Sequence, residues 1–246
     1  MRRLLPEPAT EVNVPDLVEK FAPWEEATAE RPFVYMNFAL TLDGHSTIDG
    51  VSRSIGSSRD TEMLVALRTR CDAVMIGAGT LRAEKYGRVV ADPKKREERE
   101  SVGLEPDPLI VIVSGSLDLP WDAPIFTEAA GRIVIFTASS DEPPETATPV
   151  DVIRHEGRVD LNEALAHLRA EEGVRALLCE GGATLHGELQ KAGCVDEIFV
   201  SLAPKLAGGR GPGLAEGLDP HVRELEVVWL VTEPETGELF ARYRVA

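Results

Sequence analysis

The sequence predicts an α/β fold in which helices flank a mixed, mainly parallel β-sheet, with a β-hairpin at the C-terminal end. Short apolar runs typical of buried strands alternate along the chain with stretches of helical period. Two of these runs end in glycine-rich turns, at residues 77–79 and 181–182. Near the end of the chain, two further apolar runs flank the turn sequence of residues 235–237, which indicates the hairpin.

The elements follow from these patterns in order. The expected strands are residues 33–42, 72–76, 109–113, 133–137, 150–154, 176–179, 197–203, 225–232 and 238–245. The expected helices are residues 57–70, with Ser57 or Ser58 as N-cap, 161–171 and 183–191. The charged, aperiodic residues 82–107 are expected to form a long surface loop that can include a short helix. Residues 1–32, rich in proline and glutamate, are expected to form an N-terminal arm before a single domain over residues 33–246.

Composition narrows the possible functions. The net charge is −16, from 42 acidic and 26 basic residues, so nucleic acid and anionic membranes would repel the chain. No apolar run approaches the roughly 20 residues that span a bilayer, and no signal peptide is visible, so we expect a cytoplasmic protein. The three cysteines show no close-pair spacing. The histidines are isolated from one another and predict no metal site; they are His45, His155, His167, His186 and His221.

The turn after residue 179 is the most informative segment. Glu180 precedes Gly181 and Gly182, and a helix is expected to start at Ala183. Paired glycines allow backbone N–H groups to approach a ligand, and a helix N-terminus favours anionic oxygens. A second strand-to-glycine turn, at residues 77–80, repeats the device, and together the two turns suggest a dinucleotide site. The alternatives are that glycines end the strands for steric reasons and that Glu180 caps the helix.

Other polar residues have two interpretations each. Asp43 is either part of a turn after a strand or a carboxylate that orients or protonates a substrate. Arg68 either pairs with Glu62 or Asp72 or binds an anion. A final set of basic residues could bind a phosphate or only increase solubility: Arg82, Lys85 and Arg88.

Taken together, these segments resemble the riboflavin-biosynthesis reductase family, whose fold is like that of dihydrofolate reductase. The matching segments are residues 31–34, 39–44, 67–74, 77–80, 180–185, 195–198 and 203–209. They follow the family's order and spacing over about residues 31–215.

The resemblance implies an NADPH-dependent reductase that converts a ribosyl group to a ribityl chain, with 5-amino-6-(5-phosphoribosylamino)uracil as the expected substrate. Asp43 and Glu180 are the candidates for proton delivery, directly or through water. The expected cofactor-binding residues are Ala39, Ser54, Gly77, Gly79, Thr80, Glu84, Gly181, Gly182, Ala183, Thr184 and Leu185, within a turn that runs to Gly187. The expected substrate-binding residues are Ser52, Arg68, Arg88 and Glu180. The resemblance also implies a homodimer, with the apolar C-terminal hairpin as its contact.

Two further expectations concern phosphate groups. The 2′-phosphate of NADPH needs a basic or hydroxyl-rich pocket, for which Ser114, Ser116 and Arg132 are candidates. The family usually continues after Gly-Ala-Gly-Thr with Asp-Asp-Pro-x-Leu-Thr-x-Arg, a segment that helps to hold the substrate. Here residues 81–88 differ: Glu84 can replace the first aspartate, but the proline and the Leu-Thr step are absent. Arg82, Lys85 or Arg88 would then bind the substrate phosphate.

This departure keeps two alternatives open. One is the same fold and cofactor acting on another heterocycle such as dihydrofolate, and the other is a non-catalytic nucleotide-binding protein. The deaminase motifs His-x-Glu and Pro-Cys-x-x-Cys are absent from the sequence, so only reduction is expected of this chain.

Overall fold

Residues 1–220 and 222–246 are described by the computed structural model, in which the chain forms two units. We call the first the hairpin unit; it consists of Met1–Phe21, Val34–Leu67 and Ala183–Ala246. We call the second the parallel-sheet unit; it consists of Ala22–Phe33 and Arg68–Gly182.

Five strands of the parallel-sheet unit lie side by side in the order β7-β3-β4-β5-β6, and every neighbouring pair is parallel. Their bounds are β3 (Ala73–Gly77), β4 (Leu109–Ser114), β5 (Ile133–Thr137), β6 (Val150–Arg154) and β7 (Ala176–Cys179). β3, β5 and β7 are buried along their whole length, as their continuous apolar sequences predict. In such a sheet all strands end at the same edge, which brings the residues that follow them together.

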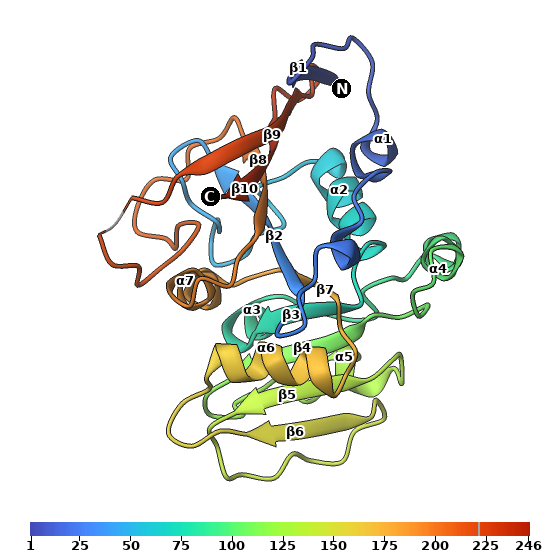
Figure 1. The fold of residues 1–246 in the computed structure, drawn as a ribbon. Helices are drawn as coiled ribbons and strands as arrows, with labels where there is room; N and C mark the ends of the chain where they lie inside the picture. Colours follow the sequence, from blue (N-terminus) through green and yellow to red (C-terminus); the bar gives the residue numbers. More distant parts are fainter. Residues whose placement is uncertain (221) are drawn as a thin grey trace. The chain divides into compact units, whose positions relative to one another are not determined.

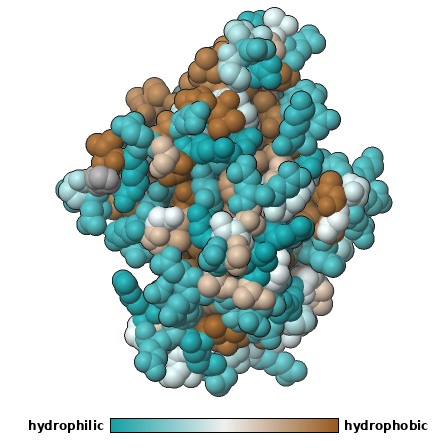
Figure 2. Space-filling model, viewed as in Figure 1, coloured by the Kyte–Doolittle hydropathy of each residue, from teal (hydrophilic) through white to brown (hydrophobic). Residues whose placement is uncertain are grey.

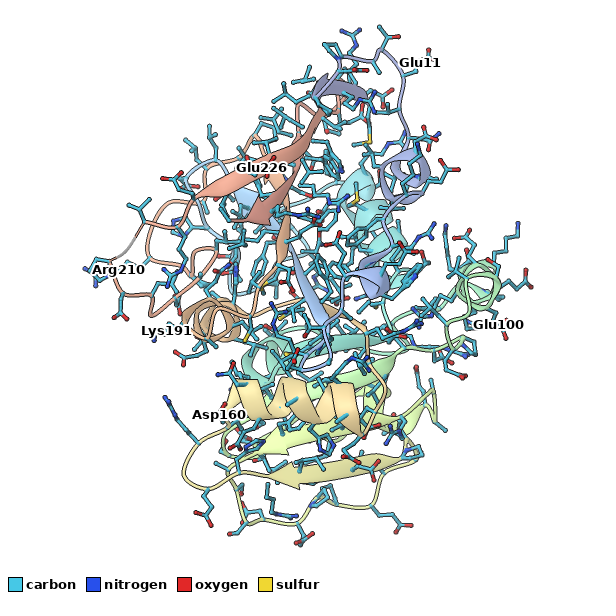
Figure 3. The ribbon with its side chains drawn as sticks, in the orientation of Figure 1. Glu11, Glu100, Asp160, Lys191, Arg210 and Glu226 are labelled. Carbon is cyan, nitrogen blue, oxygen red and sulfur yellow. The ribbon has the colours of Figure 1, made fainter. Side chains whose placement is uncertain are left out.

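The helices of this unit, apart from the first, lie between its strands along the chain. They are η1 (Pro23–Glu25), α3 (Ala78–Ala83), α4 (Pro93–Ser101), α5 (Pro124–Thr127) and α6 (Leu161–Ala170). Figure 1 shows α6 lying across one face of the sheet. Its N-cap is Asp160, labelled in Figure 3, whose carboxylate accepts hydrogen bonds from the backbone N–H groups of Asn162 and Glu163. The predicted apolar face of α6 is buried at Leu161, Leu165 and Leu168.

The hairpin unit has a mixed sheet. Its strands are β1 (Arg2–Leu5), β2 (Phe33–Thr41, buried at nearly every position), β8 (Glu197–Ala203), β9 (Leu225–Thr232) and β10 (Leu239–Val245). Their order is β1-β9-β10-β8-β2. β9 and β10 form the predicted antiparallel hairpin, whereas β2 and β8 are parallel. Of the strand pairings within the two units, five are parallel and three antiparallel, which confirms the predicted mixed, mainly parallel sheet.

The helices of the hairpin unit are α1 (Val14–Val18), α2 (Ser58–Arg68) and α7 (Ala183–Lys191). The hydroxyl group of Tyr35 donates to the carbonyl oxygen of Leu67 on α2, and the ring of Phe38 stacks on His186 of α7. Tyr35 and Phe38 are three residues apart on one strand, so their side chains point to opposite faces. α2 and α7 therefore cover opposite faces of β2, as Figure 1 also shows.

Residues 82–107 include a helix whose bounds the sequence did not predict. The short helix that the sequence allowed in this loop is the nine-residue α4, with Asp92 as its N-cap and Pro93 in its first turn. Arg99 of α4 is fully buried, and its guanidinium donates to the carbonyl oxygens of Arg68, Cys71 and Glu105. The helix is therefore held by a buried cation, which hydrophobic periodicity does not reveal.

Candidate active site

The two glycine turns meet at the carboxyl ends of two neighbouring parallel strands, β3 and β7. The backbone N–H of Gly77 donates to the carbonyl oxygen of Gly181 at 2.8 Å. A Cβ atom built on Gly182 would lie 2.8 Å from Oγ1 of Thr80, closer than side-chain carbons normally approach. The peptide bond between Gly181 and Gly182 is cis. The structure thus places the two predicted turns together, at the edge of a parallel sheet where α/β proteins bind their ligands.

Glu180 forms a buried ion pair with Arg68, not the pairing of Arg68 with Glu62 or Asp72 that the sequence also allowed. Arg68 donates through Nε to Oε1 of Glu180 at 2.6 Å and through Nη2 to Oε2 at 2.7 Å. The Glu180 side chain is only 3% exposed. The hydroxyl group of Tyr86 donates to the same Oε2 at 3.1 Å. Glu180 is therefore a fixed anion beside the glycine turns.

The protonation states of its two donors follow from burial and charge. Burial alone lowers the pKa of Arg68, but the Glu180 carboxylate more than offsets this and raises the pKa above its ordinary value. Burial, followed by the negative charge of Glu180, raises the pKa of Tyr86 well above 10.0. Arg68 thus stays charged and Tyr86 stays a neutral donor over the physiological pH range.

Of the three basic residues after Thr80, two already have hydrogen-bond partners within the protein. Arg88, an expected substrate-binding residue, makes two hydrogen bonds to Asp107, of 2.8 and 2.5 Å. Arg82 donates to the carbonyl oxygen of Asp118 at 2.6 Å. Lys85 is exposed and makes no ion pair within the described part of the chain. Among the three cations, Lys85 is therefore the one available to a phosphate without breaking a contact. Glu84 ends α3, where its backbone N–H donates to the carbonyl oxygen of Thr80.

The end of β4 adds a hydroxyl group to this edge of the sheet. Ser114 is 2% exposed, and its Oγ has no hydrogen-bond partner within the described part of the chain. A Cβ built on Gly115, the next residue, or on Gly79 would meet nothing within 4 Å. A buried, unpartnered hydroxyl group next to an open glycine fits a bound polar ligand.

Arg132 does not belong with Ser114. It precedes β5, and the register pairs Ile110 with Ile133 and Ser114 with Thr137, so Arg132 lies at the opposite edge of the parallel sheet. It donates there to Asp151 at 2.8 Å and is ion-paired with Glu172. The expectation that Arg132 shares a phosphate pocket with Ser114 and Ser116 is therefore wrong.

In the hairpin unit, Asp43 joins two loops. Its carboxylate accepts hydrogen bonds from Thr41 Oγ1 at 2.6 Å, from the backbone N–H of Gly208 at 2.7 Å and from that of Ala207 at 3.1 Å. These three bonds, with that of Thr41 the strongest contribution, hold the pKa of Asp43 far below its ordinary value. A carboxylate in this state holds backbone N–H groups well and donates a proton poorly.

The expected residues of the 52–55 segment lie in one turn. The backbone N–H of Ile55 donates to the carbonyl oxygen of Ser52, and Lys205 Nζ donates to the carbonyl oxygens of Ser54 at 2.8 Å and Ile55 at 2.7 Å. Ala39, on β2, lies opposite Ser201 of β8. Their predicted contacts with cofactor and substrate stay predictions.

The first turns of α7 are covered by residues 214–216. The backbone N–H of Glu216 donates to the carbonyl oxygen of Ala183, and Thr184 Oγ1 lies 3.4 Å from Glu216 Oε2. His186 Nδ1 lies 2.9 Å from the carbonyl oxygen of Leu214. A Cβ on Gly187 would overlap the carbonyl oxygen of Glu216. Leu185 is buried on the same helix, and Gly187 contacts this loop.

Two residues with defined roles were missed at the sequence level. Tyr86 contacts Glu180. It is the only aromatic residue in the charged stretch 82–107, and a single aromatic residue in such a stretch could have indicated a buried contact. Buried Arg99 has no such signal. Among the described residues, no group of three or more metal-ligating side chains comes together; His221 lies outside them. Within the same residues no helix has the length and apolar character to cross a membrane.

The model of the RibD C-terminal domain matches residues 32–232. The chain belongs to the RibD C-terminal domain family. This match confirms the family resemblance seen in the sequence. Two relatives also align with this chain over most of their own length.

Two archaeal relatives carry the same name, 2,5-diamino-6-ribosylamino-4(3H)-pyrimidinone 5′-phosphate reductase. The protein of Archaeoglobus fulgidus is 35% identical over 196 residues, which are 76% of this chain and 87% of that protein. The protein of Methanothermobacter thermautotrophicus is 30% identical over 227 residues, or 87% of this chain and 99% of that protein. These names support the reductase interpretation of the RibD-family site.

Solved structures confirm the fold. A pyrimidine reductase-like protein of Corynebacterium diphtheriae superposes with a TM-score of 0.78 at 22% identity, covering 96% of this chain and 99% of that chain. The riboflavin biosynthesis reductase Rib7 of Saccharomyces cerevisiae superposes with a TM-score of 0.70 at 17% identity, covering 95% and 99%. The predicted α/β architecture is therefore the fold of these two proteins.

Proposed function

We propose that this protein is a nicotinamide-dependent reductase of riboflavin biosynthesis that opens the ribosyl group of a pyrimidine ribosyl phosphate to a ribityl chain. The observation that carries the proposal is the convergence, at one sheet edge, of a glycine cradle and a buried charged pair. Gly79 supplies open backbone, Thr80 and Gly182 lie against each other, and Glu180, which is paired with Arg68, directly precedes the second glycine turn. The names of the two archaeal relatives support the same reaction class.

The favoured substrate is 2,5-diamino-6-ribosylamino-4(3H)-pyrimidinone 5′-phosphate, because the relatives that share most of their length with this chain are named for it. The second candidate is the aminouracil expected from the sequence, 5-amino-6-(5-phosphoribosylamino)uracil. The two differ at ring position 2, which carries an amino group in the first and an oxygen in the second. Lys85 is proposed to bind the phosphate that both share, since Arg82 and Arg88 are already engaged.

NADPH fits the carboxyl edge of the parallel-sheet unit. The open glycines at positions 79 and 115 allow close approach of a backbone-bound phosphate, and the buried Oγ of Ser114 lacks a partner within the described residues. Ser114 and Ser116 are the proposed selectors of the 2′-phosphate. When bound, the nicotinamide supplies the hydride, and the protein supplies position and electrostatics.

The residues have distinct proposed roles. Glu180, held by Arg68 and Tyr86, orients the substrate and stabilises the positive charge of the iminium that forms when the ribosyl ring opens, before hydride adds to its carbon. Asp43 keeps the loop at residues 206–209 in place through two backbone N–H groups. Proton delivery through Glu180 and water is the proposed route, and delivery by Asp43 is the alternative that the pH profile of Asp43→Asn tests.

The test is a comparison of substrates with the purified protein. We expect NADPH oxidation with the diaminopyrimidinone phosphate, a product heavier by two hydrogen atoms, and a lower kcat/KM with the aminouracil. The reverse order would favour the aminouracil, and oxidation only with dihydrofolate would favour the other heterocycle class. If no substrate is turned over although NADPH binds, the chain is a nucleotide-binding protein.

A homodimer through the C-terminal hairpin is also proposed. Figure 2 shows hydrophobic surface over the part of the hairpin unit that holds β1 and β9. The exposed side chains there are Leu4, Leu5, Leu225 and Val227. Leu5 pairs with Leu230, and Leu225 and Val227 lie nearer the other end of β9, so apolar side chains are exposed along this strand and its neighbour. Light scattering should show a dimer that Val227→Glu converts to a monomer; a monomeric wild type would refute the contact.

A further inference from the structure

The hydroxyl group of Tyr86 is a third ligand of the Glu180 carboxylate. Arg68 already donates to both carboxylate oxygens, at 2.6 and 2.7 Å, and Tyr86 adds a hydrogen bond of 3.1 Å to Oε2. At the other end of the pair, Nη1 of Arg68 donates to the carbonyl oxygen of Val89 at 2.8 Å. Tyr86 and Val89 belong to one short segment, which therefore contacts both ends of the ion pair.

The segment itself is anchored on both sides of Tyr86. The backbone N–H of Tyr86 donates to the carbonyl oxygen of Glu84, and the carbonyl oxygen of Tyr86 accepts from the N–H of Ile125, in the first turn of α5. The position of the phenol is thus set by backbone contacts, not by Glu180 alone. A side chain held in this way can fix the rotamer of its partner.

We propose that Tyr86 is a positioning residue of the active site, which fixes the Glu180 carboxylate and couples it to residues 84–90. This inference rests on the proposed reductase function and deepens it, because residues 81–88 are where the chain departs from the usual family sequence. In place of the aspartate-proline segment, this chain uses a tyrosine to join the segment to Glu180. Lys85, the proposed phosphate ligand, is the residue immediately before Tyr86 and shares its anchoring.

Geometry explains why the hydroxyl group matters although Arg68 already binds both oxygens. A guanidinium and a carboxylate in a fork-to-fork pair can move together as one unit without losing their mutual hydrogen bonds. Contacts outside the pair are required to fix its place, and Tyr86 and Val89 supply them at opposite ends. Removing one of them leaves the pair intact but free to shift, and small displacements of a positioned group reduce the rate strongly.

The test is Tyr86→Phe, which keeps the ring and removes the donor. The matched control is Tyr243→Phe on β10, an identical change outside the site. We expect Tyr86→Phe to lower kcat/KM for the pyrimidine substrate about tenfold, the lower end for a hydrogen bond to a charged group. The dissociation constant of NADPH should change less than about twofold, since among the described residues the phenol has its hydrogen bond to Glu180 and none to the glycine turns. Tyr243→Phe should leave both quantities unchanged.

A double-mutant cycle that measures the free energy of unfolding in urea tests the inference without an activity assay. If Tyr86 acts on Glu180, Tyr86→Phe destabilises the wild type but has no further effect in a Glu180→Ala background. Equal destabilisation by Tyr86→Phe in both backgrounds would overturn the inference. So would an unchanged kcat/KM of Tyr86→Phe, or a loss of NADPH affinity in this variant as large as its loss of kcat/KM. Should Glu180→Ala not fold, the split between kcat/KM and NADPH affinity in Tyr86→Phe decides.

The cycle also separates this inference from the proposed function. A wild type that binds NADPH but reduces no pyrimidine would refute the function, while the urea cycle would still decide whether Tyr86 positions Glu180. An active wild type with an equally active Tyr86→Phe would refute the positioning role and leave the function standing.

Discussion

A methyl group added to Gly182 would lie 2.8 Å from the hydroxyl oxygen of Thr80. The two residues are about a hundred positions apart in the sequence, one after β7 and the other in α3. Their closeness shows that the two glycine turns lie against each other and that Gly182 is tightly packed within the protein, apart from its proposed role in binding a ligand. Experiments on Gly182 must therefore separate the two effects.

We predict that Gly182→Ala weakens NADPH binding by more than about tenfold and also lowers the melting temperature, because the new Cβ meets Thr80. Titration calorimetry and thermal unfolding measure the two effects. In a Thr80→Ala background the clash is relieved, so stability should recover. If the backbone at Gly182 contacts the pyrophosphate, the affinity of the double variant should stay well below that of Thr80→Ala alone. Recovery of affinity together with stability would show that Gly182 serves packing only.

Asp43→Asn distinguishes two roles of Asp43, holding the loop at residues 206–209 and donating a proton. The hydrogen bonds from Thr41, Gly208 and Ala207 hold the pKa of Asp43 far below its ordinary value, so the carboxylate is charged throughout the assay range. We predict a fall in kcat of about tenfold, from the loosened loop at residues 206–209, with an unchanged shape of the pH profile between about pH 5 and 9. A limb of the wild-type profile that disappears in Asp43→Asn would show that Asp43 moves a proton.

The lowered pKa of His186 predicts how the free energy of unfolding depends on pH. Burial lowers this pKa to about 4, although the hydrogen bond to the Leu214 carbonyl oxygen acts in the opposite direction. Its neutral ring fits the site because Nε2 faces the side-chain amide of Gln190 at 3.2 Å. Since the folded pKa lies below the unfolded value of 6.5, the stabilisation is present above pH 6.5 and is lost as the pH falls towards 4. Urea unfolding should show the wild type losing on the order of 3 kcal/mol over this range from this residue.

His186→Asn is the comparison for that measurement. Asparagine keeps a donor for Leu214 but does not titrate, so its unfolding free energy should fall less steeply between pH 6.5 and about 4. Parallel curves for the two proteins would mean that His186 titrates normally in the fold and would contradict its burial.

Gly187→Ala tests the loop that covers α7. A Cβ at this position would overlap the carbonyl oxygen of Glu216, a backbone atom, so residues 214–216 must move away. We predict a loss of stability of about 2 to 3 kcal/mol in urea unfolding, typical of overpacking at a tight contact. Gly213→Ala in the same loop is the control, since its nearest neighbour is the Gly44 carbonyl oxygen at an ordinary 3.6 Å. Equal effects of the two changes would show that Gly187 has no special contact with the loop.

Strands and helices with a clear hydrophobic pattern were predictable to within a residue or two. The strands over Ile133–Thr137 and Val150–Arg154 and the helix over Ala183–Lys191 have the bounds that the sequence predicts. The sequence allowed a short helix in residues 82–107 but did not predict the bounds of α4, because its surface is charged all round and its one buried side chain is Arg99. Its start signals, Asp92 followed by Pro93, were present in the sequence but are also typical of turns.

The candidate site divides in the same way. The glycine turns were predictable, because a pair of glycines directly after an apolar strand indicates a sharp turn with accessible backbone, and the structure brings the two turns together. The partner of Arg68 was not, because Glu180 lies 112 positions away and only the sheet order makes them neighbours. The prediction that Arg132 lies near Ser114 was wrong for a related reason. The place of Arg132 at one edge of the sheet depends on strand direction, which residue type does not indicate.

The central claim is hydride transfer to the ribosyl carbon of a pyrimidine ribosyl phosphate. The most direct test uses NADPH deuterated at the transferable position, with the diaminopyrimidinone phosphate as acceptor and mass spectrometry of the fragmented product. We predict one deuterium in the ribityl chain and none in the pyrimidine ring. Deuterium in the ring, or no oxidation of NADPH with either pyrimidine, would contradict the claim.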